Sequence, residues 1–363
     1  MTVTLNLHEY ERTRVLALAQ TYLSAPPTPI TSLVCADSPG GPHDYFSEGD
    51  YWWRNPNDPN GPYIQRDGET NPDNFFGHRR LLIQLSVQVA ALAAAFKLTR
   101  DRQYSDRAAA HLRAWFVDPA TRMNPHLQYA QAIKGICTGR GTGLIDTLHL
   151  AEVALATEAL QDALVEYREI QNWFADYLRW FTTHPYGIAE RDAQNNHATG
   201  WALQAAAFAR LVGNAEISAD CQRRSKEILL PDQMAADGSF PRELARTKPF
   251  GYSIFNLDVM AGICQLASTP ADDLWRLETR DGCGLRRGME FLYPFLKDKS
   301  SWRWARDVMH WEGWPVRQPA LLFGALAYDE PKYLKLWKTL NSDPADAEII
   351  RNMPIRQPVL WVR

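Results

Sequence analysis

The sequence predicts an all-α fold, and three observations support this prediction. Apolar residues recur at the i, i+3, i+4 and i+7 spacing that places them on one face of a helix. Several of these segments are rich in alanine, as expected where helices pack closely together. The alternating pattern of a half-buried strand is rare along the chain. The segments with helical spacing are Leu81–Leu98, Tyr104–Phe116, Leu144–Leu160, Tyr167–Phe181, Ala202–Val212 and Ser253–Leu266.

Long segments without this periodicity separate the predicted helices, and they are rich in Gly, Pro, Asn and Trp. Loops of this length are uncommon in compact domains and are often functional when they occur. We therefore expect helical hairpins whose loops form a cleft on one face of the molecule. The predicted loops are 35–77, 118–143, 183–196, 231–252 and 298–319.

Composition bounds the class of protein. The 363 residues show no low-complexity linker or break in composition, so we predict a single domain, 1–363. A formal net charge of −3 does not favour nucleic acid or an anionic membrane as a partner. We expect no apolar run of membrane-spanning length, and the N-terminus has the pattern of an amphipathic helix rather than a signal peptide. Oligomeric state and localisation stay open.

No metal or cofactor is expected. The five cysteines are widely spaced and odd in number, and the nine histidines are scattered. Neither pattern matches a zinc motif or a disulfide framework.

The first candidate for chemistry is Asn195-Asn196-His197, at the start of an alanine-rich helix. One Asn at this position is explained by N-capping alone. Two amides and an imidazole at the positive end of a helix are also suited to binding a carboxylate. The second candidate is the loop that carries Arg242 and Arg246 and ends in Tyr252, where another helix begins.

Together these two blocks resemble the alginate lyase family of polysaccharide lyases, in which an Asn-Asn-His segment and a later Arg…Tyr segment build one site. The resemblance extends upstream to four further blocks, and so covers roughly residues 45–265. These blocks are Tyr51-Trp52-Trp53-Arg54-Asn55-Pro56 with Tyr63, Arg66-Asp67-Gly68-Glu69-Thr70-Asn71-Pro72, Thr121-Arg122-Met123-Asn124-Pro125 with Tyr129-Ala130-Gln131, and Gly139-Arg140-Gly141.

The resemblance implies an α/α toroid of about five to seven helical hairpins and an acidic polysaccharide as substrate. It implies that Asn196 and His197 lie near the substrate carboxylate, that Arg246 is a charge partner, and that Tyr252 transfers the proton. The interval from Arg246 to Tyr252 looks one residue shorter than in mannuronate-cleaving members, which leaves open Arg242 as the charge partner. Further candidates for substrate binding are Arg140, Gln131, Asn195, Arg242, Trp53, Arg66, His126 and Tyr129.

These residue types suit β-elimination from a 1,4-linked uronic acid. Neutralising the carboxylate stabilises the enolate-like transition state, after which a base removes the C5 proton and an acid protonates O4. A tyrosine phenol has a reference pKa near 10, and we expect a neighbouring cation to lower that pKa. In β-mannuronate and β-glucuronate one tyrosine serves as both base and acid, because the proton and O4 lie on one ring face. In guluronate, His197 would be the base.

Two other classes of function remain open at this point. A glycoside hydrolase would need two carboxylic acids, and Asp67, Glu69, Asp237 and Glu243 are available. A non-catalytic module that binds acidic glycans would use the aromatic and arginine residues but would not need Tyr252 beside cations.

Overall fold

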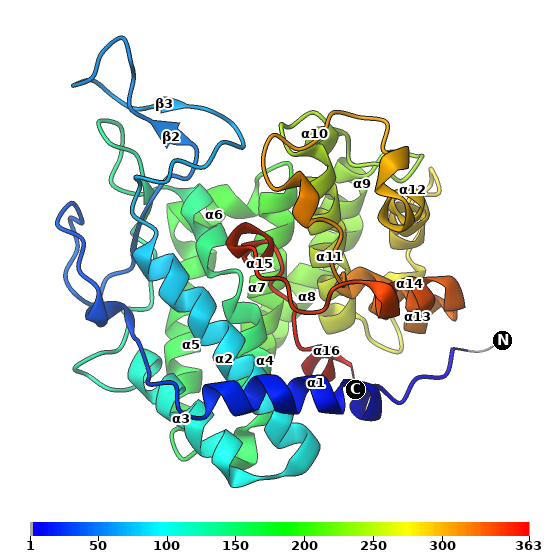
Figure 1. Ribbon diagram of the computed structural model, residues 1–363, viewed down its shortest axis with the longest axis horizontal. Coiled ribbons are helices and arrows are strands. Elements are labelled where there is room, and N and C mark those ends of the chain that lie inside the picture. Colours follow the sequence, from blue (N-terminus) through cyan, green and yellow to red (C-terminus); the bar gives the residue numbers. More distant parts are fainter. Residues whose placement is uncertain (1–2, 363) are drawn as a thin grey trace.

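The computed structural model describes residues 3–362. Helices dominate, and they form an incomplete α/α toroid with long loops gathered at one end (Figure 1). The first half contains α1 (Leu7–Tyr22), α2 (Gly77–Thr99), α3 (Arg102–Phe116), α4 (Leu150–Ala159), α5 (Tyr167–Thr183) and α6 (Pro185–Arg191). The middle contains α7 (Asn196–Val212), α8 (Ala215–Arg224), α9 (Leu230–Gln233), α10 (Pro241–Leu244) and α11 (Pro249–Ala267). The last part contains α12 (Leu285–Lys297), α13 (Pro319–Tyr328), α14 (Pro331–Thr339), α15 (Ala347–Arg351) and α16 (Pro358–Trp361).

Five inner helices of residues 3–362 contact one another in the order α2, α4, α7, α11 and α13. The last four are buried on nearly every side, which is why their apolar residues do not form a single stripe. Outer helices such as α3, α5 and α12 are amphipathic and bury one face against this inner row. The prediction of an all-α toroid is therefore confirmed, at the low end of the expected number of hairpins.

The gap in the ring is filled by the C-terminal segment, because α16 contacts α1, α2 and α4. This places α15, just before it, next to the loops at the upper end of the toroid (Figure 1). Buried apolar side chains from α1 to α16 form one continuous core.

Helix α2 also meets the length and hydropathy of a membrane-spanning helix, which contradicts our expectation that no apolar run approaches that length. Its alanines and leucines are interrupted only by uncharged polar residues over a long stretch. In the structure 67% of the apolar window is buried, as in the core helix of a globular protein.

The strands are short and belong to the loops. β1 (Phe46–Glu48) pairs in parallel with β4 (Tyr129–Ala132), matching Phe46 with Tyr129 and Glu48 with Ala132 across an irregular register. β2 (Trp52–Trp53) pairs antiparallel with β3 (Ile64–Gln65), matching Trp52 with Gln65. These ladders fix two loops above the inner helices. Short 3₁₀ or π segments complete the chain: η1 (Ile30–Ser32), η2 (Gly141–Thr147), η3 (Gln161–Ala163), η4 (Ser225–Leu229), η5 (Leu274–Arg276), η6 (Lys299–Ser301) and η7 (Trp311–Gly313).

Candidate active site

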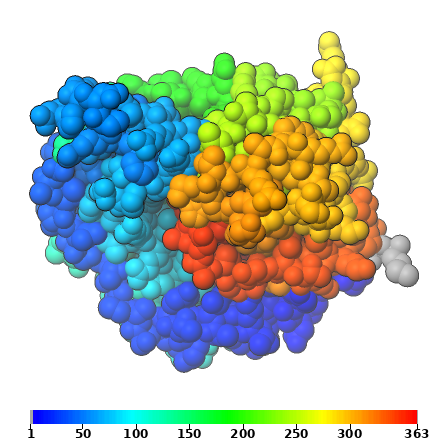
Figure 2. Space-filling view, turned by 45° about the horizontal axis from the view of Figure 1, so that its top comes forward, coloured from blue at the N-terminus to red at the C-terminus, as the bar shows by residue number. Residues whose placement is uncertain are grey.

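A cavity of about 850 Å³ opens among the loops at the upper end of the toroid. Figure 2 shows this face, where segments far apart in the sequence lie side by side. The cavity is lined by segments near β2 and β3, β4 with η2, α6, the start of α7, the α10–α11 region and the end of α15. The lining residues are Asp50, Tyr51, Gln65, Asp67, Gln131, Arg140, Gly141, Thr142, Ile145, Ala189, Glu190, Ala193, Gln194, Asn195, Asn196, His197, Arg242, Arg246, Tyr252, Phe255, Arg351 and Asn352.

The start of α7 presents its amides to this cavity. Asn195 is the N-cap, and its side-chain oxygen accepts from the backbone N–H of His197 at 3.2 Å. The backbone N–H and Nδ2 of Asn196 donate to the two carboxylate oxygens of Glu243, at 2.8 and 2.7 Å. Glu243 is only 1% exposed, and burial raises its pKa although Asn196 opposes the rise. Glu243 therefore orients Asn196, whose Nδ2 keeps a second hydrogen for a ligand.

His197 forms an ion pair with Glu190 of α6. The Nδ1 atom lies 2.6 Å from Oε1 of Glu190, so Nε2 is the nitrogen left for a bound molecule. Burial by itself would lower the pKa of His197, but the carboxylate of Glu190 outweighs it and the pKa is raised. The imidazole is therefore biased toward its cationic form, which suits a partner for a carboxylate.

Arg246 lies between a loop carboxylate and an aromatic ring. Its Nε and Nη2 atoms donate to the two oxygens of Asp67 at 3.0 and 2.6 Å. Its guanidinium carbon is 4.5 Å from the ring centroid of Tyr252. The loop approaches closely here because Gly68 has a φ of +77° and a Cβ would clash with the hydroxyl of Thr247. Glycine thus allows Asp67 to reach Arg246.

Tyr252 is 9% exposed, in the first turn of α11, and its hydroxyl is 2.7 Å from the hydroxyl of Tyr51. The expectation that a neighbouring cation lowers the pKa of Tyr252 holds for the contribution of Arg246 but not for the net shift. Burial raises the pKa well above its usual value and Tyr51 adds to the rise, whereas Arg246 acts in the opposite direction and is outweighed. The resting side chain is therefore a neutral phenol.

Tyr252 is held in place by the N-terminus of its helix. Pro249 occupies the first turn of α11, where its missing N–H costs nothing. The backbone N–H groups of Phe250 and Gly251 both donate to the carboxylate of Asp307, at 2.9 Å each. Asp307 thus caps α11 from another part of the chain.

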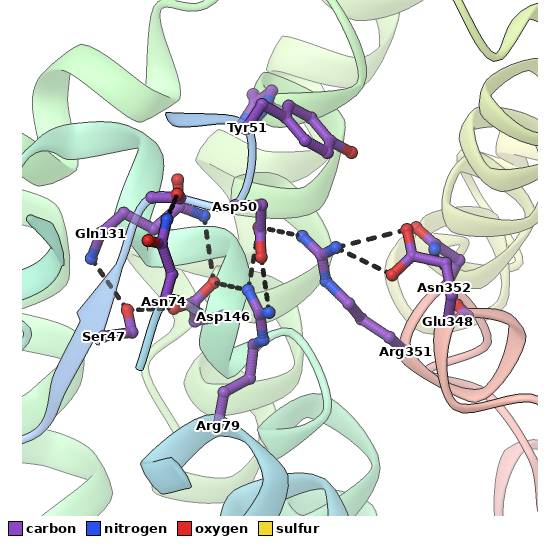
Figure 3. A network of polar contacts seen from close by, with 12 residues as sticks. Ser47, Asp50, Tyr51, Asn74, Arg79, Gln131, Asp146, Glu348, Arg351 and Asn352 are labelled. Carbon is purple, nitrogen blue, oxygen red and sulfur yellow. Dashed lines mark hydrogen bonds and ion pairs between the residues drawn. The ribbon is translucent and has the colours of Figure 1, made fainter. Parts of the chain in front are cut away.

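A network of buried charges lies beneath Tyr51 (Figure 3). Arg79 of α2 donates to Asp50 at 2.5 and 2.9 Å and to Asp146 at 3.3 Å. Arg351 of α15 donates to Asp50 at 2.6 Å and to Glu348 at 3.0 Å. This network ties the wall of the cavity to the C-terminal segment of the chain.

Arg140 also lines the cavity and is fixed by Gln131. Its Nη2 donates to Oε1 of Gln131 at 2.8 Å, and its Nε donates to the Gln131 carbonyl at 3.2 Å. Gln131 has a φ of +51°, a rare conformation for a residue other than glycine. The conformation is stabilised because its amide N–H donates to Ser47 and its Nε2 to Asp146. Burial lowers the pKa of Arg140.

The sequence profile of the family described as alginate lyase matches residues 31–302, which is most of the chain. The chain belongs to the alginate lyase family.

Solved structures agree with this assignment. The crystal structure of an alginate lyase from Bacteroides ovatus is 30% identical to this lyase, with a TM-score of 0.82 over 94% of this chain and 92% of that chain. Alginate lyase A1-III from Sphingomonas species A1 is 14% identical, with a TM-score of 0.55 over 98% and 94% of the two chains. A histidine variant of A1-III, solved with a tetrasaccharide, has a TM-score of 0.60 at 14% identity. Likeness to A1-III shows the toroid fold alone. No curated protein sequence matched significantly. This chain is thus a polysaccharide lyase, as predicted.

The structure gathers most of the predicted site residues of the lyase around one cavity. Asn195, Asn196, His197, Arg246 and Tyr252 all line it. So do Gln131, Arg140 and Arg242. Arg242 is exposed and donates to the carbonyl of Gln194 at 2.6 Å, whereas Arg246 lies over the Tyr252 ring. This geometry favours Arg246 as the cation nearest the phenol.

Four of the predicted substrate-binding residues lie outside the cavity wall. Arg66 lies over the ring of Trp53 at 4.9 Å, on the β2–β3 hairpin that projects from the loop end (Figure 1). His126 is 3.2 Å from Asp44, and its ring neighbours Tyr129. All four are held by local packing rather than directed into the cavity, so their roles remain predictions.

The sequence did not single out several residues of the wall. Tyr51 lies in one of the blocks that carry the family resemblance, but no role was predicted for it. No role was predicted for Glu190, Asp50, Arg351 or Asn352 either. Glu190 follows Pro185, which begins a seven-residue helix inside a predicted loop. A Pro at the first helical position was the available signal. Arg351 carried no signal, because only the closing of the ring brings it to the cavity.

The carboxylates of the cavity do not favour hydrolysis. Asp50, Asp67 and Glu190 line it, and each is paired with at least one cationic side chain. Glu243 is bound to Asn196, while Glu69 and Asp237 are exposed and do not line the cavity. A hydrolase needs one carboxylic acid that stays protonated beside the scissile bond.

Proposed function

We propose that this lyase cleaves a 1,4-linked polyuronate, of the polymannuronate or glucuronan type, by β-elimination that requires no metal ion. The observation that carries the proposal is the convergence of Asn196, His197 and Arg246 on the cavity that holds the Tyr252 phenol. The name of the Bacteroides ovatus relative, an alginate lyase, supports an acidic polysaccharide of this kind.

The substrate carboxylate would bind where Asn196 and His197 face the cavity. A second hydrogen on Nδ2 of Asn196 and the Nε2–H of a cationic His197 are donors for its two oxygens. As the C5 proton leaves, negative charge spreads onto these oxygens, and donors fixed in advance stabilise that charge more than the ground state. Glu243 holds Asn196 in this orientation, and Glu190 holds His197.

Tyr252 would carry the proton. As the phenolate, having lost its proton to solvent, it takes the C5 proton. The C5–H electron pair becomes the C4–C5 double bond, the C4–O4 bond breaks, and O4 leaves with that electron pair. Tyr252 then gives the same proton to O4 and is restored as the phenolate. Because the pKa of Tyr252 is raised at rest, we expect activity to increase toward alkaline pH.

The electrostatics also favour one configuration of sugar. Cleavage of guluronate by this scheme needs His197 as a neutral base, but Glu190 raises the pKa of His197. A cationic His197 and a tyrosine that acts on one ring face fit β-mannuronate and β-glucuronate, whose C5 hydrogen and O4 share a face. We therefore place polyguluronate last among the substrates.

The test is digestion of polymannuronate, glucuronan and polyguluronate, followed by the ultraviolet absorbance of the new double bond. We expect the first or second to be cleaved fastest, with one absorbing end per new reducing end, and no loss of rate with a metal chelator. Tyr252→Phe should abolish turnover and retain oligosaccharide binding. Reducing ends without the absorbance, or full activity in Tyr252→Phe, would refute the proposal.

A further inference from the structure

A lysine ammonium lies beside the two phenols of the site. Lys248 directly precedes α11 and is 4% exposed, so its charge is almost completely removed from water. Its Nζ is 5.2 Å from the ring centroid of Tyr51 and 6.0 Å from that of Tyr252. Burying a cation is costly unless nearby groups offset its charge, so the groups around this ammonium indicate what it does.

The ammonium is held from the far end of the chain. Nζ of Lys248 donates to Oε1 of Glu348 at 3.0 Å. Glu348 in turn accepts from Arg351, and Arg351 donates to Asp50, the residue before Tyr51 (Figure 3). These contacts fix Lys248 against Tyr51 from α15, a helix beyond the matched region 31–302.

We propose that Lys248 is a further positioning residue of the site. Its ammonium lies beside Tyr51 and, through the hydrogen bond between Tyr51 and Tyr252, stabilises the negative charge that Tyr252 carries during catalysis. This inference rests on the proposed function, because it assumes that the phenolate of Tyr252 is the base. The two hydroxyls are 2.7 Å apart, so charge on one is shared through the hydrogen bond to the other.

The other charged groups near the phenols are paired too, as Lys248 is with Glu348. Arg246 is neutralised by its bidentate contact with Asp67. Arg351 is shared between Asp50 and Glu348, and Arg79 between Asp50 and Asp146. At the start of α11, the Asp307 carboxylate accepts from the backbone N–H groups of Phe250 and Gly251. Beyond Tyr252, the imidazole of His197 is paired with Glu190, and Glu243 with Asn196.

The balance of the network gives the direction of the effect. Its three carboxylates (Asp50, Asp146 and Glu348) face three cations (Arg79, Arg351 and Lys248). Removing the charge of Lys248 leaves one net negative charge next to Tyr51. Forming a phenolate there then becomes less favourable, because like charges repel strongly where water is excluded.

The experiment compares pH profiles of kcat for the wild-type enzyme and for Lys248→Met, Lys248→Gln and Lys248→Arg. The matched control is Lys97→Met, since Lys97 is a partly buried lysine that donates to the Val359 carbonyl, on α2 away from the cavity lining. Ultraviolet titration of tyrosinate in the same proteins reports the phenols without relying on turnover.

We expect both neutral variants to move the acid limb of the kcat profile upward by about one to two pH units, the shift from a unit charge at about 6 Å and an effective dielectric constant of about 20 to 40. Lys248→Arg should restore most of this shift, and Lys97→Met should leave the limb in place. In the ultraviolet titration, one tyrosine of the neutral variants should lose its proton at a higher pH than it does in the wild-type protein.

A purely structural role gives a different result. Lys248→Met would then lower kcat equally at every pH and lower the melting temperature, with no shift of the limb, and this would overturn the inference. If one neutral variant fails to fold, the other decides the question. If neither folds, Lys248→Arg decides it: because this variant keeps the positive charge, an acid limb of kcat that differs from the wild-type limb contradicts the inference. Unsaturated products from any active variant leave the proposed function standing, so the two ideas fail separately.

Discussion

The carboxylate of Asp67 and the guanidinium of Arg246 form a two-point ion pair across 179 positions of sequence. Burial alone would raise the pKa of Asp67, but Arg246 and the neighbouring Thr247 outweigh it and the pKa is lowered. A carboxylate with a lowered pKa contributes stability above its ordinary pKa near 3.9, and this is lost as the pH falls through the lowered value. The pair therefore persists at every pH where the lyase would act.

Replacing Asp67 with Asn should weaken catalysis without changing its chemistry. Arg246 would lose its charged partner and its fixed position over Tyr252. Thr247 would lose the carboxylate oxygen but keep its hydrogen bond to the backbone carbonyl of residue 67. We expect kcat/KM to fall by about 10- to 100-fold, the scale of one charge-assisted contact, with products that remain unsaturated. Glu69→Gln, two residues away and exposed, is the control. Complete loss of activity in Asp67→Asn would point instead to a direct role for this carboxylate.

The pair between Glu190 and His197 predicts a change in pH dependence. Glu190→Gln should lower the pKa of His197, because burial is then no longer outweighed. If the imidazolium binds the substrate carboxylate, the alkaline limb of kcat/KM should move to lower pH. The histidine resonance should titrate at lower pH in the same variant by nuclear magnetic resonance.

The raised pKa of His197 also makes the stability of the fold depend on pH. A histidine with a raised pKa stabilises the fold below its ordinary pKa near 6.5, and this contribution is lost as the pH rises through the raised value. The mutation should therefore destabilise the lyase more at pH 5 than at pH 9. Glu158→Gln, which breaks a pair with Arg210 and leaves the cavity intact, should show neither effect. An unmoved alkaline limb would mean that the charge of His197 is not used.

Asp307 offers a test of how Tyr252 is positioned. Its carboxylate accepts from two N–H groups in the first turn of α11, and Asp307→Ala would leave both without this partner. Helix caps of this kind contribute about 1–2 kcal/mol. We expect a loss of that size in urea unfolding, together with a fall in kcat at unchanged pH optimum. Asn214→Ala removes the cap of α8 and should cost similar stability with normal kcat. Equal kcat in both variants would show that the cap does not position the phenol.

Local rules were sufficient for the parts of the site that depend on neighbouring residues. Asn195 has the sequence pattern of an N-cap, and it caps α7 where predicted. Tyr252 lies in the first turn of the helix whose start the Pro-containing loop indicates. The six predicted helical segments all fall within or across observed helices, because their apolar spacing reflects burial against neighbours.

Pairing between distant segments was not predictable in the same way. Nothing near Glu243 in the sequence indicates that its carboxylate binds Asn196, and nothing near Arg351 indicates Asp50. These contacts exist because the ring of helices returns the C-terminal segment to the loops. The raised pKa of Tyr252 has the same origin, since burial by surrounding elements outweighs the effect of Arg246.

Asp50 is the centre of the buried network and should be the most sensitive position for stability. It is 3% exposed and accepts from both Arg79 and Arg351, which outweigh burial and lower its pKa. Asp50→Asn would leave two buried guanidinium groups facing a neutral amide, and removing one partner of a buried ion pair costs about 3–5 kcal/mol. Urea unfolding at neutral pH measures this loss, with the exposed Asp73→Asn as control. Since the wild-type carboxylate keeps its charge until the pH falls through its lowered pKa, the gap between wild type and Asp50→Asn should narrow only in strong acid. A gap that closes already near pH 5 would show that Asp50 is not held as the anion between the two arginines.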